Sequence, residues 1–144
     1  MAANARFAFA AHILAAIAQA PAGKALSSVY LASSVNTHPV VVRRIMADLV
    51  SAGLVRASAG KKGGFRLGRP AADISLWDIM KAVDGCTVFG FNPNPVNPRC
   101  PVSVAMGQAL QPVLGRAQRA VELSLSQTKV CDLLGATSPP ANQS

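Results

Sequence analysis

The chain has 144 residues, of which 51% are hydrophobic and 5% aromatic, and its formal net charge is +8. This length is enough for one ordinary domain with its own core, and the hydrophobic content excludes a mainly disordered chain. Because aromatic residues are scarce, the core must consist mostly of Ala, Val, Leu and Ile, which favours closely packed helices over a sheet sandwich. The positive charge predicts a polyanionic partner, either nucleic acid or an anionic membrane surface.

Membrane insertion and secretion are both unexpected for this sequence. No apolar run reaches the length that spans a bilayer. The Ala-rich residues 1–20 include His12 and Gln19 and place their apolar side chains at helical spacing, so we interpret them as a helix rather than a secretion signal. The three cysteines are odd in number and lack a C-x-x-C spacing, which argues against a secreted disulfide framework. We expect a cytoplasmic protein that does not bind membranes.

The first predicted helix covers residues 4–20, from an N-cap at Asn4 to a stop at Pro21-Ala22-Gly23. Its expected core stripe consists of Phe7, Ala11, Leu14 and Ala18, with Ala10 and Ile17 beside it.

Two further helices are predicted on either side of a turn at residues 35–38. The earlier helix begins at a cap on Ser27 or Ser28 and ends near Ser34. The later one runs from Pro39, which suits a first helical turn, to about Ala52, and Gly53 ends it. Its expected buried stripe consists of Val42, Ile45, Met46 and Leu49.

A β-hairpin is predicted next, with strands at 54–58 and 65–67 around the Gly-rich loop 60–64. Seven of the 14 Lys and Arg residues lie between Arg43 and Arg69, but only one of the 6 acidic residues, Asp48, lies there. Two helices joined by a tight turn, followed by a basic hairpin, indicate a winged helix-turn-helix.

The second half of the chain alternates short and long elements. Ser75 is expected to cap a helix over 76–83, and a loop rich in Pro and Asn follows at 87–99. A long helix is predicted from Pro101 or Ser103 to about Leu125, and Pro112 indicates a kink there or a true start at Gln111. Thr128 is expected to cap a last turn through Leu134, and the polar tail 138–144 is not expected to be ordered.

Four segments together resemble the BadM/Rrf-type family of winged-helix transcription regulators, which includes IscR and NsrR. They are NTHPVVVRRI (36–45), LVSAGLV (49–55), GKKGGFRL (60–67) and ISLWDI (74–79), and the resemblance extends over roughly residues 6–135. It implies a cytoplasmic homodimer that pairs through its long C-terminal helix and represses or activates promoters.

The same resemblance bears on cofactors. Iron–sulfur members of the family hold their cluster with three closely spaced cysteines between the fourth helix and the dimerisation helix. Here only Cys100 lies at that place, since Cys86 precedes the loop and Cys131 lies far beyond it. The segment NPRCPV (97–102) resembles cluster-free members instead. We therefore expect no cofactor and no metal site.

The expected fold is mostly α with a small β-hairpin wing, that is, a winged helix-turn-helix plus a long C-terminal dimerisation helix. We divide the chain into a DNA-binding domain (1–85), a Pro/Asn-rich sensing loop (86–100), a dimerisation helix region (101–135) and a disordered tail (136–144). The predicted function is that of a sequence-specific transcriptional regulator, a repressor, which acts as a homodimer on a palindromic operator and responds to oxidants or electrophiles through Cys100.

Double-stranded DNA is the expected partner, with phosphate contacts supplying affinity and base-edge contacts supplying specificity. Arg43 and Arg44 point about 100° apart on a helix, so at most one of them faces a given base. Lys61 and Lys62 at the hairpin tip are expected to enter or straddle the minor groove. The predicted DNA-binding residues are Ser28, Ser33, Thr37, His38, Val40, Val41, Arg43, Arg44, Arg56, Lys61, Lys62 and Arg66.

A homodimer is expected because a single small domain would leave a helix as long as 101–125 partly uncovered, whereas a two-fold pair covers it and matches a palindromic operator. The predicted dimer interface consists of Leu110, Val113, Leu114, Ala117, Val121 and Leu125, which follow a heptad-like spacing. A helix packed on its own domain is the alternative.

Cys100 is the principal candidate for sensing a signal. It lies beside Arg99 at a predicted helix N-terminus, where the helix dipole favours a thiolate. A disulfide from Cys100 to Cys86, or to Cys131 of a second copy, would alter the angle between two DNA-binding units. The alternative is three inert thiols that pack as small hydrophobic groups.

Other function classes fit the sequence less well. An enzyme is not expected, because the acidic residues show no paired spacing and no nucleophile motif is present. A regulator that senses a small ligand remains possible, with its pocket between the winged domain and the long helix. A winged helix used for protein contact is the other alternative.

Overall fold

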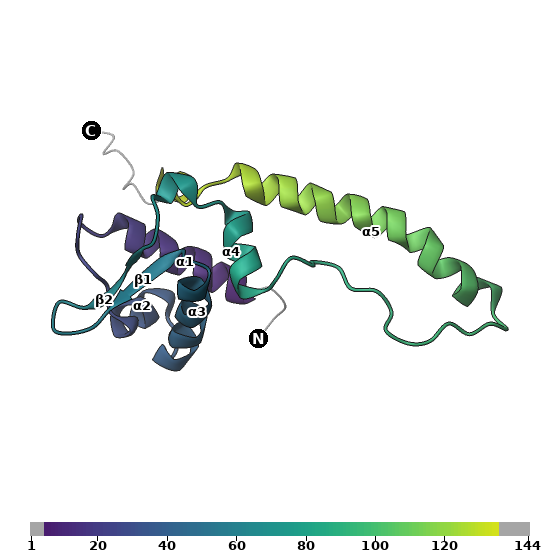
Figure 1. Cartoon of the computed structure of the whole chain (residues 1–144), viewed down its shortest axis with the longest axis horizontal. Helices are drawn as coiled ribbons and strands as arrows, with labels where there is room; N and C mark the ends of the chain where they lie inside the picture. Colours follow the sequence, from purple (N-terminus) through teal and green to yellow (C-terminus); the bar gives the residue numbers. More distant parts are fainter. Residues whose placement is uncertain (1–4, 136–144) are drawn as a thin grey trace, which may run out of the picture.

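The computed structural model describes residues 5–135, and within them the chain forms a winged-helix body from which one long helix projects (Figure 1). The elements in order are α1 (Ala5–Gln19), α2 (Ser28–Val35), α3 (Pro39–Ser51), β1 (Val55–Ser58), β2 (Gly64–Leu67), η1 (Ala71–Asp73), α4 (Leu76–Val83), α5 (Pro101–Gln127) and α6 (Val130–Leu134). The mostly helical fold with a two-stranded wing that the sequence predicted is confirmed. The predicted N-cap Asn4 and the tail 138–144 lie outside the described residues.

Local capping fixes the helix-turn-helix. The Ser27 hydroxyl accepts a hydrogen bond from the Tyr30 N–H at 3.1 Å, so Ser27 rather than Ser28 caps α2. Asn36 then takes the left-handed conformation at φ 59°, which its short polar side chain tolerates, and the chain reverses. Pro39 occupies the first turn of α3, and Gly53 at φ 75° follows its end.

The wing is an antiparallel hairpin in which Val55 pairs with Leu67 and Ser58 with Gly64. A third strand-like contact braces it, because Leu26 and Phe65 exchange backbone hydrogen bonds of 3.0 and 2.8 Å. Gly64 makes this approach possible, since a Cβ at that position would lie 2.6 Å from the Leu26 carbonyl oxygen. The wing is therefore fixed to the segment that precedes α2.

The core lies among α1, α3, α4 and the base of the wing, and the predicted buried stripe of α3 is confirmed in full. The stripe predicted for α1 is displaced, because the buried residues are Ala10, Ile13, Leu14 and Ile17. Phe7, Ala11 and Ala18 pack only at its edge. This helix is apolar on nearly every side, so its sequence pattern does not single out one face.

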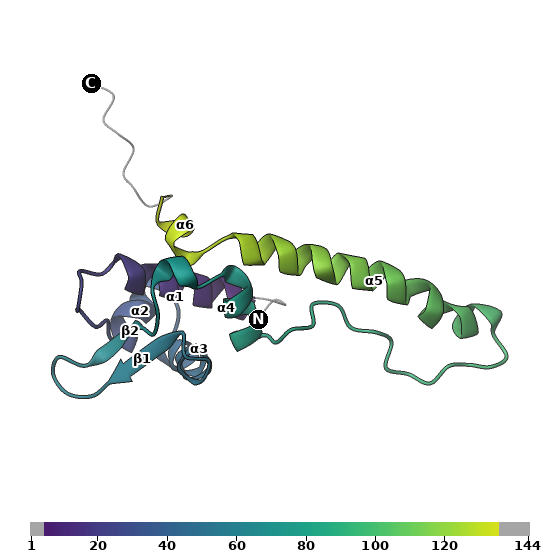
Figure 2. The ribbon, with the colours of Figure 1, turned by 45° about the horizontal axis from the view of Figure 1, so that its top comes forward.

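The C-terminal turn returns to the body and packs beside α1 (Figure 2). Val130 is fully buried in the core, and backbone hydrogen bonds join Leu76 to Thr128 and Val130 to Ile74, each at 2.9 Å. The prediction that Thr128 caps this turn is wrong, because the N-cap of α6 is Lys129, whose N–H donates to Asp132 at 2.7 Å. Thr128 is instead the C-cap of α5, and its carbonyl oxygen accepts a hydrogen bond from the Leu76 N–H.

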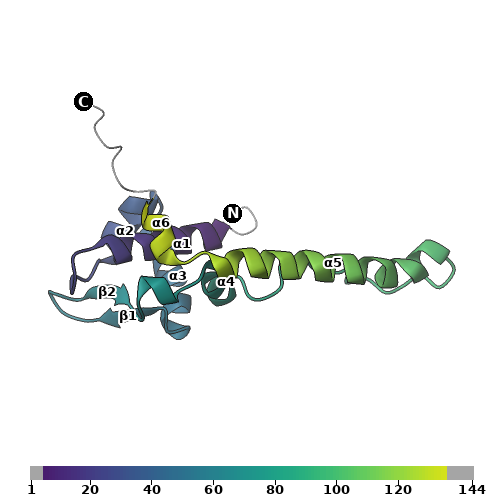
Figure 3. The same cartoon turned by 90° about the horizontal axis from the view of Figure 1, so that it is seen from above.

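Helix α5 is continuous from Pro101 to Gln127 and has no buried residue. The alternative start at Gln111 is therefore wrong. Pro112 removes the N–H that would pair with the Gln108 carbonyl, but both residues are exposed, so that carbonyl is open to solvent. Seen from above, α5 extends well beyond the body (Figure 3). None of the helices in residues 5–135 is long and apolar enough to cross a membrane.

The segment between α4 and α5 runs beside α5 to its far end and turns back into it (Figure 1). Gln118 holds the start of this loop, because its side chain accepts from the Val88 N–H at 2.9 Å and donates to the Cys86 carbonyl. At the far end the Ser103 hydroxyl accepts from the Asn97 N–H at 2.9 Å. The division of the chain at residues 85, 100 and 135 stays a prediction.

Candidate nucleic-acid interface

The buried residues of α3 lie on one side of this helix, so the side that faces solvent can be identified. Successive residues turn by about 100°, so the side opposite the core carries Val40, Arg44, Ala47 and Ser51, all of which are exposed. Arg43 lies on the flank toward the wing, where it borders a shallow hollow of about 480 Å³ against Ala57 and Phe65. Arg44 thus faces outward and Arg43 faces the wing.

The opposite flank of α3 is occupied by an ion pair. Asp48 binds the guanidinium of Arg6 in α1, and Arg6 also donates to the Val83 carbonyl at 2.9 Å. The only carboxylate of α3 is therefore engaged within the protein. The sequence showed that Asp48 was isolated among basic residues, but it gave no means of finding Arg6 as its partner.

The residues that enter α3 have mixed roles. The Nδ1 atom of the exposed His38 accepts a hydrogen bond from the Val40 N–H at 3.2 Å and so caps the helix. Thr37 is half-buried, and its N–H donates to the Ala32 carbonyl at 2.9 Å. Val41 is half-buried against the core. Of the predicted contacts in this stretch, His38 and Val40 are the exposed ones.

The basic side chains of the wing differ in how exposed they are. Lys61 and Lys62 at the tip and Arg56 on β1 are exposed. Arg66, which pairs with Arg56 across the hairpin, is half-buried and donates from Nε to the Gly23 carbonyl at 2.9 Å and from Nη1 to the Ser58 hydroxyl at 3.0 Å. Arg66 therefore braces the wing, which the sequence did not indicate.

Helix α2 adds serines at both of its ends. Ser28 is half-buried and Ser33 is exposed. Lys24 and Tyr30, which the sequence did not single out, are both exposed and line an open hollow with Ser27 and Ser34. Their position before and within a helix-turn-helix was the only available indication, since the first helix of that motif crosses the DNA backbone.

The cysteines lie far apart within one chain. Cys100 immediately precedes α5, whereas the Cys86 carbonyl is bonded to Gln118, so the two are separated by about 27 Å of helix at 1.5 Å per residue. A disulfide requires Cα atoms within about 7 Å. The predicted Cys86–Cys100 disulfide is therefore wrong within one chain, because the loop follows the helix to its far end. Cys131 lies in α6, and all three thiols are free.

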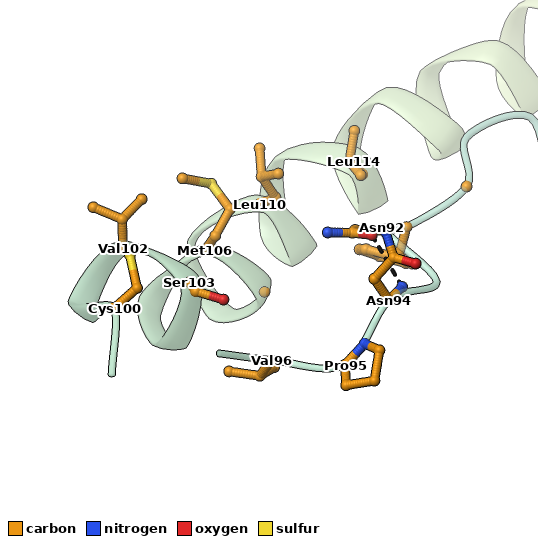
Figure 4. A pocket seen from close by; sticks show the side chains of 13 residues that line it. Asn92, Asn94, Pro95, Val96, Cys100, Val102, Ser103, Met106, Leu110 and Leu114 are labelled. Atoms are coloured by element: carbon orange, nitrogen blue, oxygen red, sulfur yellow. Dashed lines mark hydrogen bonds between the residues drawn. The ribbon is translucent and has the colours of Figure 1, made fainter. Parts of the chain in front are cut away.

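The far end of α5 contributes a hollow of about 390 Å³ between the loop and the helix (Figure 4). Val102, Met106, Leu110 and Leu114 face it from α5, and the loop closes its other side. Cys100 and Ser103 also line it. This hollow is remote from the wing, unlike the ligand pocket that the sequence left open between the winged domain and the long helix.

A tight turn between two helices, an outward basic second helix and a lysine-tipped hairpin define a winged-helix DNA-binding protein. Residues 3–136 match the Rrf2 family, described as iron-dependent transcriptional regulators, and the chain belongs to that family. It is therefore a helix-turn-helix transcriptional regulator and not an enzyme, as the sequence predicted.

Three similar proteins illustrate the relationship. YwnA of Bacillus subtilis (strain 168), named as a candidate HTH-type transcriptional regulator, is 38% identical over 132 residues, which cover 91% of this chain and 96% of YwnA. A crystal structure described as that of a candidate DNA-binding protein is 36% identical, with a TM-score of 0.72 over 90% of this chain and 98% of that one. CymR, described as the global cysteine regulator of B. subtilis, shares the fold at 21% identity, with a TM-score of 0.71 over 96% and 99% of the two chains.

The family description raises the question of an iron site. Within residues 5–135, no group of three His, Cys, Asp or Glu side chains lies close enough together to hold a metal ion. Cys86 and Cys100 lie at opposite ends of the loop, and Cys131 lies in α6. The donors of one chain therefore do not fit an iron or iron–sulfur centre.

Proposed function

We propose that the protein acts as a homodimer that binds a palindromic operator in the cytoplasm and represses transcription by occupying the promoter. The observation that supports the dimer is α5, which has 27 residues and none buried. Leu110 and Val113 are 41% and 46% exposed, and a contiguous apolar surface of this kind marks an interaction site. Leu114, Ala117, Val121 and Leu125 continue the same stripe and are half-buried.

A two-fold pair of α5 helices would cover this stripe and place two α3 helices on one side of the assembly. Half-sites one helical turn apart then correspond to the two copies. Sedimentation at micromolar concentration tests the pairing. The wild type is expected at twice the chain mass of 14.8 kDa, and Leu110→Glu at the mass of one chain. Gln108→Glu adds the same charge on the other side of α5 and should remain dimeric, whereas a monomeric wild type contradicts the proposal.

The proposed signal that controls DNA binding is a chemical change at the Cys100 thiol, without a metal or an iron–sulfur cluster. We call this the thiol input. Cys100 is half-buried at the mouth of the hollow beside α5, and the exposed Arg99 precedes it. Because Cys86 of the same chain is out of reach, a disulfide from Cys100 would have to join two copies, with Cys131 of the second copy as the proposed partner. Oxidant should change the DNA affinity of the wild type and of Cys86→Ser but not of Cys100→Ser. An equal change in all three proteins contradicts this input.

A regulator of the same type that senses a small ligand is the second candidate. The hollow beside α5 supports it, because a volume of about 390 Å³ with an apolar lining suits a small molecule. Enlarging Gly107, which lines this hollow, to Leu should abolish the response to such a ligand without altering basal DNA binding. A response that depends on Cys100 but not on Gly107 favours the thiol input instead.

A further inference from the structure

The outward face of α3 limits which bases this helix can read. Val40, Arg44 and Ala47 follow one another along that face, at intervals of four and three residues. Ser51 ends the helix, away from the N-terminal turns that usually reach base edges. The central position thus holds a guanidinium between two small apolar side chains.

No carboxylate and no amide side chain lies on this face. The one carboxylate of α3, Asp48, lies on the flank and is bound by Arg6. His38 accepts the Val40 N–H with Nδ1, so its neutral ring carries the proton on Nε2 and presents a donor outward. The hydroxyl groups of Thr37 and Ser51 pair with donors and acceptors alike, so they do not select a base.

The guanidinium and the apolar side chains on this face can recognise two of the four bases, guanine and thymine. An Arg side chain binds the N7 and O6 acceptors of guanine in a bidentate manner, and apolar side chains contact the thymine methyl group. Direct reading of adenine needs a side chain that both accepts and donates, and reading of cytosine needs an acceptor. We infer that α3 specifies one G·C pair through Arg44 and neighbouring A·T pairs through the thymine methyl groups that Val40 and Ala47 contact.

The spacing of these side chains fixes the pattern. Val40 and Arg44 are separated by about 6 Å along the helix, and Arg44 and Ala47 by about 4.5 Å. Base pairs are stacked about 3.4 Å apart, so each apolar contact falls within about two base pairs of the guanine. The half-site is thus a G·C pair with A·T pairs on both sides. This pattern rests on the proposed operator binding, in which a palindrome repeats it.

Arg43 has a different role from its neighbour. It faces the hollow beside the wing, whose other lining side chains include Met46, Val50 and Phe65. On this flank we place it against a phosphate strand that passes between α3 and the hairpin, whereas Arg56 points to the opposite face of the hairpin from Ala57 and Phe65. Arg43 therefore raises the affinity for DNA of any sequence, whereas Arg44 raises the affinity only for sequences that carry the G·C pair.

Selection from random DNA followed by affinity measurements tests this reading code. Arg44→Ala should reduce the preference for the G·C pair, measured as a ratio of affinities, about 10- to 100-fold, the range expected for one bidentate contact. Arg43→Ala, the matched control, should weaken all sequences and keep the preference. Replacing a flanking thymine with deoxyuridine removes only its methyl group and should weaken the wild type about fourfold. Val40→Ser, which replaces the apolar side chain with a short polar one, should lose that response at one of the flanking positions.

The outcomes separate the reading code from the proposed dimeric operator. A palindrome whose half-site has no G·C pair, or whose G·C preference persists in Arg44→Ala, overturns the code and leaves the operator proposal standing. A single unrepeated half-site with a G·C pair between A·T pairs supports the code and contradicts the palindrome. If no sequence is enriched, both are rejected.

Discussion

Arg6 in α1 binds Asp48 in α3, and this pair joins the N-terminal helix to the second helix of the helix-turn-helix. Arg6 also donates to the Val83 carbonyl at the end of α4. One guanidinium therefore links α3 to α4, the element that leads into the loop and α5.

Loss of this link should lower both stability and DNA affinity. The pair is partly exposed, with 36% and 41% of the two side chains accessible, so its Coulomb contribution is at the low end for ion pairs. Adding the lost hydrogen bond to Val83, we expect Arg6→Ala to reduce the free energy of unfolding by about 1 kcal/mol. Urea unfolding measures this change. Arg119→Ala, on the exposed side of α5, should change it little, and equal losses in the two variants contradict the assignment.

The wing arginines and lysines should differ in the salt dependence of binding. Lys61→Ala/Lys62→Ala removes two exposed cations from each chain and should reduce the slope of log affinity against log salt by up to about 1.8 per chain, or about 3.6 for the proposed dimer. Arg66→Ala should weaken binding with a smaller change in slope, because Arg66 is bonded to Gly23 and Ser58. Titrations at several salt concentrations give both quantities. An unchanged slope in the double variant excludes phosphate contact by the wing tip.

Gly64 should be far more sensitive to substitution than Gly60. Both have positive φ, 134° and 95°, but a Cβ at Gly64 would lie 2.6 Å from the Leu26 carbonyl oxygen, whereas a Cβ at Gly60 meets nothing within 4 Å. We expect Gly64→Ala to lower the free energy of unfolding by about 2 kcal/mol or more, and Gly60→Ala by about 1 kcal/mol. Thermal and urea unfolding provide the comparison. The reverse order would mean that the wing is not anchored at Leu26.

Asp78 should make stability depend on pH. Burial raises the pKa of this carboxyl group, but hydrogen bonds from the Ser75 N–H and hydroxyl and the nearby Lys81 and Arg69 outweigh it, so the pKa is lowered from its ordinary value of 3.8. A lowered pKa in the folded protein adds stability that is complete above the unfolded value and is lost as the pH falls through the folded value.

We therefore expect Asp78→Asn to be less stable than the wild type by about 1 kcal/mol near neutral pH. The difference should shrink as the pH falls below 3.8. Unfolding at a series of pH values measures it, with the exposed Asp73→Asn as the control. A difference that is the same at pH 7 and below the folded pKa contradicts the role of the charge.

Sequence patterns predicted the local structure of the DNA-binding half well. Capping by Ser75, termination at Gly53 and the stripe of α3 depend on neighbouring residues, so one sequence is enough to find them. The first helix was harder because its alanines make every side apolar, which left Ile13 out of the predicted stripe.

Contacts between distant residues were not predictable from the sequence. The Arg6–Asp48 pair, the bracing by Arg66 and the separation of Cys86 from Cys100 all depend on how segments pack in three dimensions. Pro112 was misleading for a different reason, since a proline within an exposed helix leaves a carbonyl that water can satisfy. The predicted interface along α5 is a property of two chains and remains a prediction.

The mass of the protein–DNA complex on its selected operator tests the central claim most directly. Native mass spectrometry or sedimentation of the wild type with the selected duplex gives the number of chains bound. We predict two chains of 14.8 kDa per palindrome, with Leu110→Glu binding more weakly and one chain at a time. A single wild-type chain that saturates the operator would contradict the claim.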